Sequence, residues 1–274
     1  MAGRLYVVGT PIGNLGDITE RAIATLRSVD LVAAEDTRRT GRLLVHLGIK
    51  KTMRSLFEGN ERARTQELLA ELRQGREVAL VSDAGMPGIS DPGYLLVRAC
   101  VEAGIEVRIV PGPSAVTAAL VVSGLPSERF VFEGFLPRKV AARGERLRAI
   151  ADDVRTIVVF ESPLRLPSLL ADVVAELGDR RIAVCRELTK LHEEVVRGRV
   201  SEVRALLAGS RTRGEIVVVI EGARDAEPVA LDRLVDEARL LVKDGMRKRE
   251  AAAIVARERG GSANAIYEVL VRRR

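Results

Sequence analysis

Several residue types that mark common protein classes are rare or absent in this chain. Of its 274 residues none is tryptophan, aromatic residues make up 3%, and there are two cysteines and two histidines. Neither His46 nor His192 has a cysteine or histidine partner at ligand spacing, so we expect no metal site. Cys100 and Cys185 lie far apart in the sequence, and we expect them to be buried free thiols rather than a disulfide.

The motifs of several large enzyme classes are missing as well. The sequence has no G-x-x-x-x-G-K-[ST] phosphate loop and no G-x-S-x-G nucleophile elbow. The glycines of Gly9–Gly16 do not have the G-x-G-x-x-G spacing of a dinucleotide fold, and Pro11 lies among them. NAD binding, ATP binding and acyl transfer are therefore disfavoured.

Long apolar runs are also missing. No run reaches the roughly 20 residues that a membrane-spanning helix needs, and the chain does not open with a basic segment followed by an apolar one. We therefore expect a soluble, cytoplasmic protein without a membrane partner.

The sequence is instead rich in short aliphatic runs that alternate with helical patterns. Hydrophobic residues make up 47% of the chain, which predicts an α/β fold with large aliphatic cores. Residues 1–123 repeat a strand followed by a helix five times and predict a first α/β domain with glycine loops. After a linker at Pro126–Ser127, residues 127–223 predict a second α/β domain with antiparallel pairing. Residues 228–274 contain three short helical patterns and predict a helix-turn-helix-like module.

Positive charge is concentrated in two places. The net charge is +6, and Lys243–Arg274 alone holds nine basic residues against four acidic ones. Between Gly134 and Ile150 there are five basic residues against one acidic residue. Two separate basic patches predict a polyanionic partner such as nucleic acid. The C-terminal helices suit either RNA binding or packing as a small bundle, and the sequence does not decide between them.

The most informative stretch is SDAGMPGISDPG, residues 82–93. It follows the apolar run Val78–Val81 and precedes a helical pattern that begins near Tyr94, at the strand end where open α/β sheets bind ligands. Its length exceeds the roughly two to six residues of an ordinary strand-to-helix connection. The run Pro111–Leu120 opens another helix at the same sheet edge and offers free backbone N–H groups. The pattern predicts a cleft for an organic cofactor held by backbone groups and a few carboxylates.

Seven motifs occur in the order and spacing of one known family. They are GTPIGNLGDIT from Gly9, AEDTR from Ala34, SDAGMPGISDPG from Ser82, PGPSAVTAAL from Pro111, EGFLPRK from Glu133, FESPLR from Phe160 and CRELTKLHEE from Cys185. Over residues 4–223 the chain resembles the tetrapyrrole methylase superfamily, and within it the ribosomal RNA small subunit methyltransferase I branch. The C-terminal helices resemble the helix-turn-helix module of that branch. One departure is Leu56–Glu61, which reads LFEGNE where the family has a histidine-rich LFHEHNE-like run; Asn60 and Glu61 still match.

The resemblance implies a fold, a cofactor and a reaction. The fold is that of a class III methyltransferase, with a cofactor cleft between two α/β domains and a small all-α C-terminal module. The reaction is methyl transfer from S-adenosylmethionine to the ribose 2′-hydroxyl of a decoding-site cytidine in 16S rRNA, by a homodimer acting on the small ribosomal subunit. Carried over by motif, the cofactor contacts are Ile12, Ser82, Asp83, Ala84, Gly85, Met86, Ser114, Ala115, Glu161 and Leu188.

Direct transfer to a ribose hydroxyl needs a proton acceptor, because the hydroxyl is a poor nucleophile. The acceptor candidates at strand ends are Glu35, Asp36, Glu187 and Lys190, the last on the condition that burial lowers its pKa. Each of them can instead form ion pairs that hold loops. In residues 82–93, called the central loop from here on, we expect Asp83 to face the cofactor and Asp91 to brace the loop. The predicted RNA-binding residues are Arg38, Arg138, Lys139, Arg143, Arg146, Lys248 and Arg249.

Two alternative functions stay open. One is methylation of a corrin or porphyrin precursor on the same fold, although such proteins carry a central loop nearer to G-D-P than Ser82–Gly85 and have less reason for a basic helical tail. The other is a non-catalytic RNA-binding protein that has retained the fold, which predicts no binding of S-adenosylmethionine.

Overall fold

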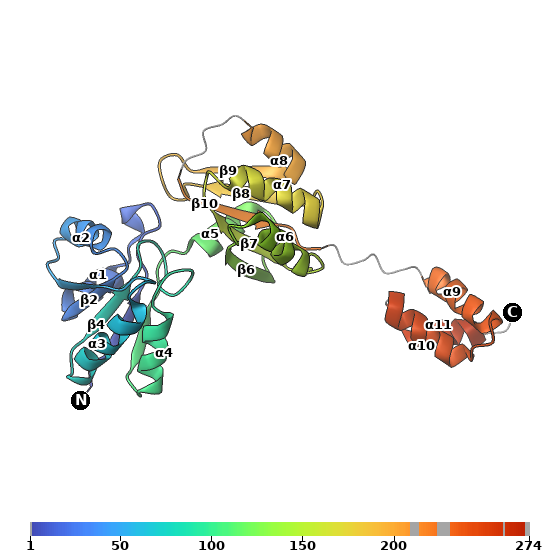
Figure 1. The fold of residues 1–274 in the computed structure, drawn as a ribbon, viewed down its shortest axis with the longest axis horizontal. Helices are drawn as coiled ribbons and strands as arrows, with labels where there is room; N and C mark the ends of the chain where they lie inside the picture. Colours follow the sequence, from blue (N-terminus) through green and yellow to red (C-terminus); the bar gives the residue numbers. More distant parts are fainter. Residues whose placement is uncertain (1, 209–213, 224–230, 260, 272–274) are drawn as a thin grey trace. The chain divides into compact units, whose positions relative to one another are not determined.

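The structure, a computed structural model, describes residues 2–208, 214–223, 231–259 and 261–271. The chain forms two compact units, Met1–Gly222 and Ala223–Arg274. The first unit contains two five-stranded sheets, and the described part of the second consists of three helices (Figure 1).

The first sheet is entirely parallel, with the strand order β3-β2-β4-β1-β5. Its strands coincide with the short apolar runs of the sequence, and a helix follows each of them. The strands are β1 (Leu5–Val8), β2 (Leu31–Ala34), β3 (Thr52–Ser55), β4 (Val78–Val81) and β5 (Val107–Val110). The helices are α1 (Glu20–Ser28), α2 (Thr37–His46), α3 (Glu61–Arg73), α4 (Tyr94–Glu102) and α5 (Ala115–Ser123), with a 3₁₀ turn η1 (Leu15–Asp17) after β1.

Helices cover both faces of this sheet. In β1, Leu5 and Val7 belong to a core with α3 and α4, whereas Val8 belongs to a core with α1 and α2. Successive side chains of a strand point to opposite faces, so a sheet buried on both sides needs the nearly continuous apolar runs seen here.

The second sheet is mixed, with the strand order β6-β7-β10-β8-β9. Only β6 and β7 pair in parallel, and the other neighbours are antiparallel, as predicted for this half. The strands are β6 (Phe130–Phe135), β7 (Thr156–Glu161), β8 (Arg181–Arg186), β9 (Glu194–Arg199) and β10 (Ile216–Ile220). The helices α6 (Val140–Ala149), α7 (Leu166–Leu177) and α8 (Val200–Leu207) pack on one face around a core of seventeen buried residues.

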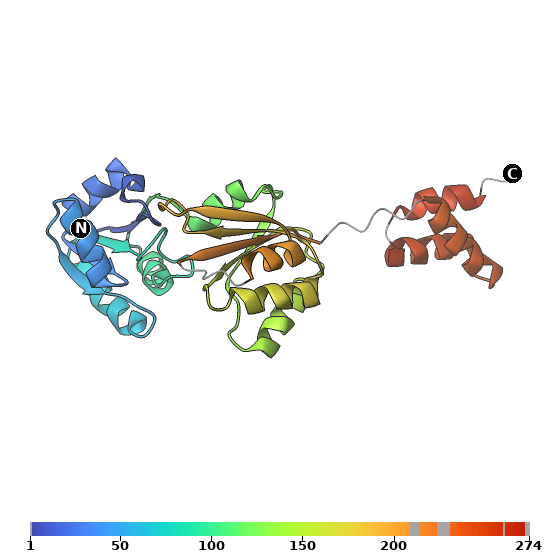
Figure 2. The same cartoon turned by 90° about the horizontal axis from the view of Figure 1, so that it is seen from above.

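Helix α5 joins the two halves of the first unit. It follows the last strand of the first sheet, but Val116, Ala119 and Leu120 pack against Cys185 and Val219 of the second sheet. It lies on the face opposite to α6, α7 and α8 (Figure 2). The segment assigned by sequence to the first domain therefore supplies part of the core of the second half, and its N-terminal end lies between the two.

The second unit is a three-helix bundle of α9 (Leu231–Lys243), α10 (Lys248–Arg259) and α11 (Ala263–Val271). All three helices contribute to one core, including Leu234, Val255 and Ile266. The hydroxyl of Ser262 accepts a hydrogen bond from Ala265 N at 3.3 Å, so Ser262 caps α11. The three helical patterns are confirmed, and the bundle has a core of its own.

Two expectations about composition can be compared with the structure. Cys100 and Cys185 are buried and free, as predicted, and burial raises the pKa of each thiol to about 11. No helix within the described ranges is both long enough and apolar enough to cross a bilayer.

Candidate active site

A cavity of about 380 Å³ lies between the two halves of the first unit. From the first half it is lined by the loops after β1, β2 and β4 and by the start of α5. From the second half it is lined by the ends of β6 and β7 and the start of β10. These segments are far apart in the sequence. In the first sheet they meet because the carboxyl ends of parallel strands lie at one edge. In the second sheet the antiparallel strand β10 begins beside the end of β7, with Ile216 opposite Glu161.

The loops after β1 and β4 hold each other in place. Thr10 and Gly85 exchange two backbone hydrogen bonds, at 2.9 and 3.1 Å, and the Thr10 hydroxyl donates to Ser82 O at 3.1 Å. Gly85 has a φ of +83°, a conformation that side chains disfavour, and a Cβ there would lie 3.3 Å from Ile12 Cγ2. The glycine is needed because the backbone is both left-handed and tightly packed, and the result is a rigid cavity wall.

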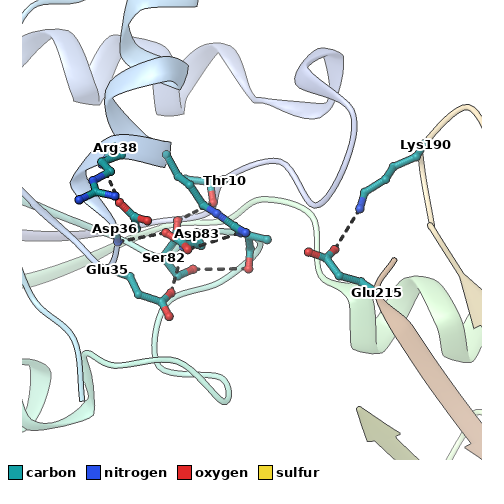
Figure 3. Close-up of polar contacts among 10 residues, drawn as sticks. Thr10, Glu35, Asp36, Arg38, Ser82, Asp83, Lys190 and Glu215 are labelled. Atoms are coloured by element: carbon teal, nitrogen blue, oxygen red, sulfur yellow. Dashed lines mark hydrogen bonds and ion pairs between the residues drawn. The ribbon is translucent and has the colours of Figure 1, made fainter. Parts of the chain in front are cut away.

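Three carboxylates of the first half, those of Glu35, Asp83 and Asp91, line this cavity, and Glu161 and Glu215 line it from the second half. Glu35 Oε2 accepts a hydrogen bond from Asp83 N at 3.1 Å, and Asp83 Oδ1 accepts one from Asp36 N at 3.0 Å (Figure 3). Burial raises the pKa of both Glu35 and Asp83, although these hydrogen bonds act in the opposite direction. The group favours a positively charged ligand, which would relieve the repulsion among the carboxylates.

Asp91 is the most strongly perturbed of the three carboxylates. Burial raises its pKa to about 7, and the negative charges of Glu35 and Asp83 act in the same direction, whereas a hydrogen bond with Ser82 lowers it. A carboxyl group with a pKa near neutrality is suited to accept or donate a proton at physiological pH. The sequence interpretation of Asp91 as a loop brace overlooked this property, which depends on burial.

The second half contributes a buried carboxylate, that of Glu161 at the end of β7. Its side chain is 0% exposed; Oε1 accepts a hydrogen bond from Ser162 N at 2.7 Å, and Oε2 lies 3.2 Å from an Arg165 guanidinium nitrogen. Oε2 has no hydrogen-bond partner among the described residues. Glu161 therefore retains capacity to accept a further hydrogen bond at the cavity wall.

Comparison with known proteins identifies the family. The family model described as Tetrapyrrole (Corrin/Porphyrin) Methylases matches residues 4–204. Proteins called ribosomal RNA small subunit methyltransferase I are 47% identical in Synechocystis sp. (97% of this chain, 97% of the relative) and 54% identical in Thermotoga maritima (80% and 99%). The chain belongs to this methyltransferase family.

Two solved methyltransferase structures share the fold. Uroporphyrin-III C-methyltransferase from Thermus thermophilus has a TM-score of 0.56 at 23% identity, covering 81% of this chain and 93% of that one. The methyltransferase CobJ has a TM-score of 0.62 at 21% identity, covering 81% and 95%. The two-sheet architecture predicted from the motifs is thereby confirmed.

The structure brings most of the family-motif residues together. Eight of the ten residues carried over by motif line the cavity, and the exceptions are Ser82 and Leu188. Ser82, the first residue of the central loop, is buried, and its carbonyl oxygen accepts a hydrogen bond from the Thr10 hydroxyl. Leu188 packs beside Ile12 in the core around α5. The eight residues that line the cavity are Ile12, Asp83, Ala84, Gly85, Met86, Ser114, Ala115 and Glu161.

Of the four predicted proton acceptors, only Glu35 lines the cavity. Asp36 caps α2, because its Oδ1 accepts a hydrogen bond from Arg38 N at 2.7 Å. Lys190 Nζ lies 2.8 Å from Glu187 Oε1. It also lies 3.3 Å from Glu215 Oε2 (Figure 3). These three residues form the ion-pair arrangement that the sequence allowed as the alternative role.

The condition under which Lys190 could accept a proton, a pKa lowered by burial, is not met. Burial acts in that direction, but the hydrogen bonds and charges of Glu187 and Glu215 outweigh it and raise the pKa. The pKa of Glu187 is lowered, chiefly by its hydrogen bond with Lys190. A cationic lysine paired with carboxylates is a poor proton acceptor. Its stem instead packs against the first half, since a Cβ on Gly13 would lie 2.5 Å from Lys190 Cγ.

The predicted RNA-binding residues differ in their surroundings. Arg38, Arg138, Lys139, Lys248 and Arg249 are exposed. Arg143 is buried and pairs with Asp172 between α6 and α7. Arg146 donates two hydrogen bonds to Glu133, at 2.7 and 2.9 Å. The guanidinium groups of Arg143 and Arg146 are thus already bound to carboxylates within the fold.

Sequence reasoning also missed the role of Glu61, the last residue of the LFEGNE run and one that matches the family. Its Oε1 accepts hydrogen bonds from Gly93 N at 2.8 Å and Leu95 N at 3.1 Å. Glu61 therefore caps α4 and holds the end of the central loop.

No cluster of three or more potential metal ligands occurs in the part of the chain that the structure describes.

Proposed function

We propose that this chain transfers a methyl group from S-adenosylmethionine to the ribose 2′-hydroxyl of a decoding-site cytidine in 16S rRNA. The observation that carries the proposal is the convergence of eight family-motif residues, from loops far apart in the sequence, on one cavity between the two halves. The relatives named ribosomal RNA small subunit methyltransferase I match nearly the whole chain at 47% identity. The porphyrin enzyme with the same fold is 23% identical, which favours the rRNA substrate over a tetrapyrrole.

The residues at the cavity fit this cofactor. S-adenosylmethionine carries positive charge on its sulfonium and amino groups, and Glu35, Asp83 and Asp91 form a negatively charged wall. The apolar side chains of Ile12 and Met86 can cover its aromatic and thioether parts. No side-chain hydrogen bond caps α5 among the described residues, so the backbone N–H groups at its start are free for a carboxylate.

When bound, the cofactor supplies an already activated methyl electrophile. The protein must then orient the ribose hydroxyl and accept its proton. We assign the acceptor role to Asp91, with Glu35 beside it, because both line the cavity and their pKa values are raised toward neutrality. Asp36, Glu187 and Lys190 act instead by capping α2 and by holding the loops of the second half.

RNA would be held by exposed basic residues. Arg38, Arg138 and Lys139 flank the cavity-forming loops of the first unit, and Lys248 and Arg249 lie on the helical bundle. Their contacts with phosphates would make the affinity fall steeply with salt. Removal of residues 223–274 is expected to lower RNA affinity and its salt dependence, and unchanged values would show that the bundle has another role.

A homodimer is part of the same proposal. Val101 on α4 and Ile109 on the edge strand β5 are 65% and 58% exposed, and apolar side chains at an open sheet edge favour association with a second copy. Light scattering should give twice the 29.8 kDa mass of one chain, and a mass of one chain would contradict the dimer.

Two measurements test the enzymatic proposal. Calorimetric titration of the full chain with S-adenosylmethionine should show binding, and the Glu35→Gln variant should bind more weakly than a charge-matched control, Glu20→Gln on the exposed start of α1. A tritiated-methyl assay on small ribosomal subunits that lack the modification should then place label on a ribose. Absence of cofactor binding would indicate a non-catalytic RNA-binding protein, and label on a base would refute the 2′-hydroxyl assignment.

A further inference from the structure

A second, smaller depression adjoins the main cavity. It has a volume of about 190 Å³, and Arg39 and Asp83 line both spaces. Small-molecule pockets usually measure about 300–1,000 Å³, so the depression is too small for another cofactor. Thr10 of the loop after β1 and Arg42 of α2 form other parts of its wall.

The charge of this depression comes from α2. The helix has the sequence TRRTGRLLVH, with three arginines and no acidic residue, and Arg39 and Arg42 lie one turn apart on it. Arg39 is 54% exposed at its side chain and lies 3.5 Å from Asp83 Oδ2. Asp83 already accepts a hydrogen bond from Asp36 N, so its charge is shared between two donors.

Arg42 is one of the arginines of the first unit without a carboxylate partner in the described part of the chain. Many others, such as Arg98, Arg146 and Arg155, pair with a neighbouring carboxylate. Arg42 is exposed, and no carboxylate among the described residues forms an ion pair with it. Two guanidinium groups therefore face one partly neutralised carboxylate, which leaves the depression with an excess of positive charge.

We infer that Arg39 and Arg42 hold a backbone phosphate of the RNA next to the nucleotide that enters the main cavity. The inference rests on the proposed function. A guanidinium group binds a phosphate through paired hydrogen bonds in a fixed geometry. A nucleotide that leaves its stack to enter an enzyme cavity must be oriented through its flanking backbone. Because Arg39 borders both spaces, a phosphate held there lies beside the reacting ribose, and both arginines are positioning residues.

The test compares Arg42→Ala with Arg73→Ala in the full chain. Arg73 is exposed at the end of α3, next to the segment that leads into the amino end of β4. The control Arg73→Ala therefore removes the same charge at the opposite edge of the sheet. With unmethylated small ribosomal subunits as substrate, Arg42→Ala should raise KM about tenfold, equivalent to about 1.4 kcal/mol, with kcat nearly unchanged. The slope of log KM against log salt should fall by about one phosphate contact. Arg42→Lys should restore part of the salt slope, because it keeps the charge and loses the paired geometry.

Calorimetry with S-adenosylmethionine separates this inference from the proposed function. The affinity of Arg42→Ala for the cofactor should equal that of the wild type. If that affinity falls, the depression belongs to the cofactor site and the inference is refuted. If the wild type methylates the subunits and Arg42→Ala has the KM and salt slope of Arg73→Ala, the inference is refuted while the proposed function stands. If the wild type transfers no methyl group, both are refuted.

Discussion

Replacement of Asp91 by Asn tests both the electrostatics and the chemistry of the cavity. Asp91 lies among Glu35 and Asp83, and burial raises its pKa from 3.8 to about 7. The folded protein thus binds a proton at Asp91 more tightly than the unfolded chain does. The contribution of Asp91 to the free energy of unfolding is therefore greatest below the unfolded pKa of about 3.9. This contribution is lost as the pH rises toward 7.

The size of this effect follows from the pKa shift. A shift of about three units corresponds to about 4 kcal/mol as an upper bound, and because the carboxylate is partly exposed, solvent screening reduces it to about 2 kcal/mol. About half of that, roughly 1 kcal/mol, is lost between pH 5 and pH 8. Asn cannot ionise, so the variant should gain stability relative to the wild type by this amount over the same interval.

Thermal unfolding followed by far-UV circular dichroism measures the difference, and the absence of tryptophan makes this probe preferable to fluorescence. The gap in melting temperature between Asp91→Asn and the wild type should widen by about 2–4 °C from pH 5 to pH 8. Asp153→Asn is the control, because the hydrogen bonds from Arg155 lower the pKa of Asp153 to about 2 and it stays ionised throughout. Its effect on stability should be the same at both pH values.

The same variant tests the proton acceptor. The wild-type methylation rate should rise with pH through about 7 as Asp91 loses its proton, and Asp91→Asn should lose this rise together with about 100-fold or more of the rate. A melting-temperature gap that does not depend on pH would refute the raised pKa of Asp91. A pH-dependent rise in rate that persists in Asp91→Asn would instead assign the role of proton acceptor to Glu35.

Three further substitutions are expected to act through named contacts. Gly85→Ala should destabilise the protein by about 1–2 kcal/mol and weaken cofactor binding, whereas Gly104→Ala, also at positive φ but with no atom within 4 Å of the added Cβ, should leave cofactor binding unchanged in calorimetry. Glu61→Ala removes the cap of α4 and should cost about 0.5–2 kcal/mol, with faster proteolysis of residues 82–93 as the local measurement. Arg143→Ala breaks a buried ion pair and should cost about 3–5 kcal/mol in urea unfolding, against about 1 kcal/mol or less for Arg148→Ala on the exposed side of α6. Equal losses for the two arginines would contradict the burial described here.

The local structure could be predicted from the sequence because it depends on neighbouring residues. The runs Leu5–Val8, Leu31–Ala34 and Val78–Val81 are strands because a sheet covered on both faces needs apolar side chains at every position. Thr19, a residue type that favours helix N-caps, accepts a hydrogen bond from Ala22 N at 3.1 Å and begins α1. Family motifs located most of the cavity lining for a related reason, since glycines and prolines shape loops locally.

Neighbouring residues with the same chemistry received different roles from the fold. Glu35 lines the cavity, whereas Asp36, the next residue, turns back to cap α2. The amphipathic pattern of α2 does not show which carboxylate faces inward. The choice depends on the loop after β4, where Asp83 N donates a hydrogen bond to Glu35 and the Asp83 carboxylate accepts one from Asp36 N. Lys190 pairs with two carboxylates, and one of them, Glu215, directly precedes β10 and is connected to Lys190 by no local pattern.

The sequence alone predicted the alternation of strands and helices, antiparallel pairing in the second half, the family and the loops that form the cavity. These depend on side-chain periodicity, turn residues and motif order, which are local properties. Only the tertiary structure decided that α5 packs on the second sheet, that Asp91 has a pKa near 7, and that the fold itself uses Arg143. Burial and charge at these residues come from segments distant in the chain, and such contacts exist only once the chain has folded.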